Sequence, residues 1–130
     1  MRNMNHKEWV QNQFRAVNGR AVYRDVIIHA SFVETVTKQM AKGKDFQCSI
    51  KILGAKYTEH KPEIDKLEQL RKMRNRMIHD LLKDKELTNS EIIKTIRSMK
   101  KLLREVYHAN NGLIKRFFDE KYQIDTADFK

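Results

Sequence analysis

Residues 70–83 read LRKMRNRMIHDLLK and combine the residue types that handle phosphate groups and protons. Four of the six residues from 71 to 76 are basic: Arg71, Lys72, Arg74 and Arg76. An arginine side chain is a planar fork that matches a phosphate group, and His79 is of the type that transfers protons near neutral pH. Such a set can cleave RNA without a metal ion. His79 would take the proton from a ribose 2′-hydroxyl or protonate the leaving 5′ oxygen, while Arg74 would hold the phosphate.

One histidine performs only one of these two proton transfers at a time. A symmetry-related second copy of the chain would supply the other histidine, so this hypothesis favours a homodimer. The alternative is a solvated basic face on a helix that contains one histidine. Both interpretations fit the spacing of the residues.

Arg74 occupies an unusual position on the helix expected here. Its apolar side chains cluster on one side of a helical wheel: Ile64, Leu67, Leu70, Ile78 and Leu81. At about 100° per residue, the middle of this face lies about 280° from Ile64, and Arg74 falls at about 280° as well. Since an unpaired buried charge is costly, Arg74 must pair with a carboxylate such as Glu34 or Asp25, face a groove or dimer seam, or bind an anion.

Asn75 and His79 lie on the edge of the same apolar face. They are four residues apart, so they are neighbours on the helix surface, and the Asn75 amide can orient the imidazole. Arg71 lies one turn before Asn75 on this edge, whereas Lys72 and Arg76 point away from the apolar face. Basic residues at 71, 72 and 76 are therefore candidates for contacting a nucleic acid.

The segment 74–79, RNRMIH, resembles the signature of the HEPN superfamily (higher eukaryotes and prokaryotes nucleotide-binding), an Arg separated by four to six residues from a His. The resemblance implies an all-α bundle that dimerises with the two motifs facing each other. It implies a metal-independent endoribonuclease in RNA processing, toxin–antitoxin or phage-defence systems, with Arg74 and His79 catalytic, Asn75 orienting the site, and no cofactor. A separate protein, such as an antitoxin, would regulate it. Some members of the superfamily only bind nucleotides or partners.

Helical spacing of apolar residues predicts the elements that position this motif. We expect helices over about 5–18, 20–42 and 60–84, and a long fourth helix from about 89, with Thr88 and Glu91 forming a capping box at its start. Gly43 is expected to close the second helix. The sequence NNG at 110–112 either kinks the fourth helix or separates two helices. The tail from 125 to 130 reads as frayed.

Residues 46–58 carry a weaker pattern. Ile50 and Ile52 alternate as in a strand, but one strand without a partner is unstable, so we favour a short helical turn or an ordered loop. Together these elements predict an all-α, four- to five-helix bundle in a single domain over 1–130.

Charge and composition narrow the class of function. The formal net charge of +10 favours a polyanionic partner such as RNA. Over residues 61–104, 13 basic side chains oppose 7 acidic ones. This excess also fits two other functions: a non-catalytic nucleic-acid-binding module, and a regulatory helical protein that binds an acidic partner.

The remaining sequence features predict no metal site and no membrane association. Cys48 is the single cysteine, so we expect a small buried side chain and no disulfide or cysteine-based zinc site. The five histidines are scattered, and His29 lies near an apolar stripe where a core histidine is the simplest interpretation. No signal peptide and no run of 18 apolar residues is visible, so we expect a cytoplasmic protein.

Overall fold

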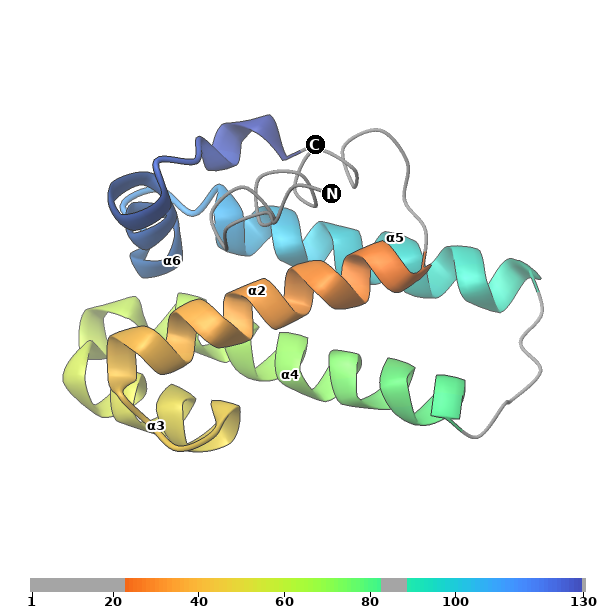
Figure 1. Ribbon diagram of the computed structural model, residues 1–130, viewed down its shortest axis with the longest axis horizontal. Coiled ribbons are helices and arrows are strands. Elements are labelled where there is room, and N and C mark those ends of the chain that lie inside the picture. The colour runs from red at the N-terminus through yellow and green to blue at the C-terminus, as the bar shows by residue number, and fades with distance from the viewer. Residues whose placement is uncertain (1–22, 83–88, 130) are drawn as a thin grey trace, which may run out of the picture.

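A computed structural model describes residues 23–82 and 89–129, and within them the chain is all-α and forms a compact bundle of five helices (Figure 1). These are α2 (Tyr23–Ala41), α3 (Phe46–Lys56), α4 (Lys61–Leu82), α5 (Asn89–Tyr107) and α6 (Leu113–Phe117). A 3₁₀ turn at Thr58–His60 precedes α4. A π-helical turn at Phe118–Tyr122 and a 3₁₀ turn at Thr126–Asp128 follow α6. The helix predicted for 5–18 and the capping residue Thr88 lie outside the described residues.

The three long helices α2, α4 and α5 pack against one another and form the centre of the molecule. α3 covers one end of α2 and α4, while α6 packs against α2 and α5. The helical spacing of apolar residues predicts one stripe on α2, formed by Val22, Val26, Ala30, Val33, Val36 and Met40. Of these, Val26, Ala30, Val33 and Val36 are buried and Met40 is partly buried, while Val22 lies outside the described residues. The predicted helices over 20–42 and 60–84 and from 89 are thus confirmed within the described residues.

Residues 46–56 correct the expectation of a loop or a single turn, because they form the three-turn helix α3. Its buried side chains recur at helical spacing: Phe46, Ser49, Ile50 and Leu53. Asp45 caps the helix by accepting a hydrogen bond of 2.7 Å from the Cys48 backbone N–H. Ile50 is buried and Ile52 lies on the outer face of α3, so the two side chains do not share one face as they would in a strand. Cys48 is half-buried, whereas the sequence predicted a buried side chain.

The turn between α2 and α3 also differs from the prediction. Lys42, not Gly43, adopts the left-handed conformation that ends α2, with φ of 57°. Gly43 is needed for a different reason: a Cβ atom there would lie 2.3 Å from the Ser49 hydroxyl and 3.0 Å from the Ser49 backbone. The glycine therefore lets the start of α3 approach the turn.

The sequence NNG separates two helices instead of kinking one. Asn111 takes a left-handed conformation, with φ of 56°, and the Gly112 N–H donates to the Ala109 carbonyl. The buried carboxylate of Glu63 on α4 accepts hydrogen bonds from the backbone of Leu113 at 2.8 Å and of Ile114 at 3.3 Å. Glu63 thus caps α6 and fixes it against α4.

Residues 125–129 pack against the core, so the expectation of a frayed tail is wrong for the described residues. Phe129 is completely buried, and its ring lies 5.1 Å from that of His29 and 5.0 Å from that of Tyr107. His29 and Tyr107 share a buried hydrogen bond of 3.0 Å, which confirms His29 as a core histidine. Burial raises the pKa of the Tyr107 hydroxyl well above its ordinary value.

Across residues 23–82 and 89–129, no helix has the length and apolar character required to cross a membrane.

Candidate functional site

The predicted motif lies on α4, in the half of the helix nearest its C-terminus. α4 begins next to Pro62, whose missing N–H costs nothing in the first turn. Buried Leu67, Leu70 and Met77 attach the helix to the core. This attachment fixes the rotation of α4 and so determines which of its polar residues meet solvent.

Arg74 points from α4 toward α2, and its side chain is only 14% exposed. One terminal nitrogen donates a hydrogen bond to the Glu34 carboxylate of α2, and the other donates to Oδ1 of Asn75 at 3.0 Å. The guanidinium also lies 5.6 Å from the centre of the Phe46 ring, a cation–π distance. Of the two carboxylates expected from the sequence, Glu34 is therefore the partner of Arg74.

The surroundings of Arg74 leave part of its hydrogen-bonding capacity unused. Its Nε is buried without a hydrogen-bond partner among the described residues, although a guanidinium offers five N–H donors. Burial lowers the pKa of Arg74. The Glu34 carboxylate is the counter-ion of this guanidinium, and it also lies 3.7 Å from the Lys38 ammonium.

Arg71 and Lys72 have an acidic neighbour on their own helix. Arg71 donates two hydrogen bonds to Glu68, at 3.0 and 2.5 Å, and Lys72 lies 4.0 Å from the same carboxylate. The hydrogen bond from Arg71 lowers the pKa of Glu68, and the same contact raises the pKa of Arg71. Both basic residues are thus partly neutralised within α4.

Asn75, Arg76 and His79 are exposed. His79 lies in the last turn of α4, one turn after Asn75 on the same side of the helix. The amide oxygen of Asn75 accepts its hydrogen bond from Arg74. The structure therefore brings Arg74, Asn75 and Glu34 into one network, with exposed His79 a turn away.

Three contacts of these residues were missed by the sequence interpretation: those of Glu68 with Arg71 and Lys72, and that of Phe46 with Arg74. Glu68 stands three residues before Arg71 and four before Lys72, a spacing from which the ion pairs follow on any helix. The contact between Phe46 and Arg74 depends on α3, whose helical nature the sequence interpretation did not predict.

In the described part of the chain, no group of three or more histidine, cysteine or acidic residues is arranged to hold a metal ion.

Comparison with known proteins gives no relative, since no family model, curated protein or solved structure matches this chain.

Proposed function

We propose that the protein is a metal-independent endoribonuclease of the HEPN type, which acts as a homodimer on RNA in a processing, toxin or phage-defence role. The observation that carries this proposal is the network on α4. Arg74 lies at the centre of the apolar face and is aligned by Glu34 and Asn75, and its buried Nε has no hydrogen-bond partner among the described residues. His79 is exposed one turn further along.

The proposed reaction needs only groups that this chain carries. His79 of one copy accepts the proton of a ribose 2′-hydroxyl, and the 2′ oxygen attacks the adjacent phosphorus. The bond between phosphorus and the 5′ oxygen breaks, and His79 of the second copy protonates that oxygen. Arg74 stabilises the charge that develops on the phosphate. The products are a 2′,3′-cyclic phosphate and a 5′-hydroxyl end.

A second candidate is a non-catalytic module that binds RNA, a nucleotide or a regulatory partner such as an antitoxin. The ion pair between Arg74 and Glu34 favours it, because Glu34 already neutralises the guanidinium. In this case Arg74 stabilises the contact between α2 and α4 and takes no part in chemistry.

Incubation of the purified protein with mixed RNA in EDTA separates the two candidates. For the endoribonuclease we expect cleavage by the parent and at least a hundredfold loss in His79→Ala and in Arg74→Ala, as is usual when a general acid–base or charge-stabilising group is removed. Arg116→Ala removes an exposed arginine from α6 and serves as the matched control with parental activity. Unchanged cleavage in His79→Ala would refute the assignment of the site.

A further inference from the structure

The outer face of α5 carries a row of exposed basic side chains that the motif on α4 does not include. The α5 cationic stripe consists of Lys94, Arg97, Lys101 and Arg104, all exposed. Their spacing of three, four and three residues places them within about 80° of one another around the helix and along about 15 Å of its axis. Buried Met99, Leu103 and Val106 occupy the opposite side.

These charges are less compensated than those of Arg71, Lys72 and Arg74 on α4, whereas Arg76 of the same motif likewise has no ion-pair partner among the described residues. Arg71 and Lys72 lie beside Glu68, and Arg74 pairs with Glu34. Within α5 the acidic residues are Glu91 and Glu105, and Glu105 pairs with Lys66 of α4 at 3.5 Å. Among the described residues, no side chain of the α5 cationic stripe has an ion-pair partner. The α5 cationic stripe should therefore attract a polyanion more strongly than the paired basic residues of α4 do.

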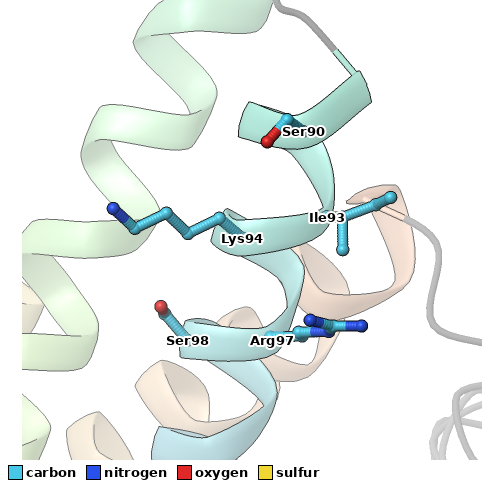
Figure 2. A pocket seen from close by; sticks show the side chains of 5 residues that line it. All are labelled: Ser90, Ile93, Lys94, Arg97 and Ser98. Carbon is cyan, nitrogen blue, oxygen red and sulfur yellow. The ribbon is translucent and has the colours of Figure 1, made fainter.

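An open hollow lies at the N-terminal half of the stripe. Its volume is about 560 Å³, and its lining consists of Ser90, Ile93, Lys94, Arg97 and Ser98. Figure 2 shows Lys94 and Ser98 extending from one side of α5 and Ile93 and Arg97 from the other, with Ser90 one turn before them. Two cations and two hydroxyl groups can each donate hydrogen bonds to phosphate oxygens.

We propose that the α5 cationic stripe binds the phosphate backbone of single-stranded RNA, with Ile93 contacting a ribose or base in the hollow. The composition of the surface favours RNA over a protein partner. A stable protein interface needs an apolar centre, whereas Ile93, which is 49% exposed, is the one large exposed apolar side chain among the described residues of this face. The inference rests on the proposed action on RNA and assigns its binding surface to α5 rather than to Arg71, Lys72 and Arg76.

The test compares two variants that lose the same charge. One is Lys94→Gln, Arg97→Gln, Lys101→Gln and Arg104→Gln combined. The control is Lys44→Gln, Lys51→Gln, Arg116→Gln and Lys121→Gln combined, which removes four exposed cations from other elements. Both are made in the His79→Ala chain so that cleavage does not consume the probe, and circular dichroism verifies that each is helical.

Binding is measured by fluorescence anisotropy with an oligouridine of about 20 nucleotides at salt concentrations between about 50 and 300 mM. We expect the stripe variant to bind at least tenfold more weakly at low salt, and the slope of log K against log salt to fall by about 3. The control variant should stay within about threefold of the His79→Ala parent.

Three results would overturn the inference: equal loss in both variants, unchanged binding in the stripe variant, or binding of polyglutamate but not of oligouridine, which would assign the surface to an acidic protein. Failure of this inference is distinguishable from failure of the proposed function. Cleavage by the unmutated protein with unaltered binding in the stripe variant would refute the stripe alone. Binding through the stripe without cleavage by the unmutated protein would refute the endoribonuclease alone.

Discussion

Arg74 has two roles in this account: it stabilises the packing of α4 against α2, and it is the residue proposed to hold the RNA phosphate. Its pairing with Glu34 attaches α4 to α2, and its hydrogen bond to Asn75 connects it to the exposed side of α4 that also carries His79. A charge that is partly removed from water needs a compensating partner. Glu34 therefore has a structural role whether or not Arg74 binds a phosphate.

Glu34→Gln tests this role. The change keeps the shape of the side chain and removes its charge, so Arg74 loses its counter-ion in a site that is only 14% exposed. We expect the free energy of unfolding to fall by about 2 kcal/mol, between the values for exposed and fully buried ion pairs. Urea denaturation measures it. If Glu34→Gln and Arg74→Gln have additive effects in the double variant, the two side chains are not coupled and the interpretation is wrong.

Arg71→Gln should shift the titration of Glu68. In the folded protein the hydrogen bond from Arg71 holds the pKa of Glu68 below its ordinary value of 4.5. A lowered folded-state pKa adds stability above the unfolded pKa, and this contribution disappears as the pH falls through the folded pKa. In Arg71→Gln the pKa should rise toward 4.5, and the loss of stability with acid should be less steep.

Carboxyl carbon NMR between about pH 2 and 6 follows this titration residue by residue, with Asp65, which pairs with Lys61 instead, as the internal control. An unchanged pKa of Glu68 would mean that Arg71 does not bind it in solution.

The central position of Arg74 could be predicted from the sequence because it needs only the 100° rotation per residue of a helix. The choice of Glu34 over Asp25 could not, since it depends on the relative rotation of α2 and α4. Ion pairs within α4, such as that between Arg71 and Glu68, depend on spacing alone and were available from the sequence.

At the scale of elements, the helices with long apolar stripes were predictable and the short ones were not. In α3 the helical spacing of Phe46, Ile50 and Leu53 was present, but the alternation of Ile50 and Ile52 obscured it. The C-terminal turn was not predictable from its own residues. Its stability derives from the pocket that His29 and Tyr107, distant in sequence, provide for Phe129.

Phe129→Ala tests whether this turn belongs to the core. Loss of a completely buried phenyl ring should lower the free energy of unfolding by about 3 kcal/mol. Lys121→Ala, at an exposed position in the preceding turn, should change it by less than about 0.5 kcal/mol. Thermal or urea unfolding measures both. Equal stability of Phe129→Ala and the unmutated protein would restore the interpretation of a frayed tail.

At the scale of the whole molecule, the proposed reaction requires two copies of the chain, because each copy supplies one His79. Sedimentation equilibrium should therefore give a mass of twice 15.6 kDa at the concentrations used for cleavage. A monomer that cleaves RNA would contradict the two-histidine scheme.

Mixed dimers test the same point through activity. If each site uses His79 from both copies, an equal mixture of unmutated and His79→Ala chains, refolded together from urea, should retain about one quarter of the activity at constant total protein. A site complete within one copy would retain about one half. Arg116→Ala in place of His79→Ala should retain full activity and controls for the refolding.

The chemistry of the RNA ends tests the central claim most directly. After incubation with a defined RNA in EDTA, the unmutated protein should produce new fragments with 5′-hydroxyl and 2′,3′-cyclic phosphate ends, and His79→Ala should produce none. New 5′-phosphate ends, or the same fragments from His79→Ala, would contradict the account.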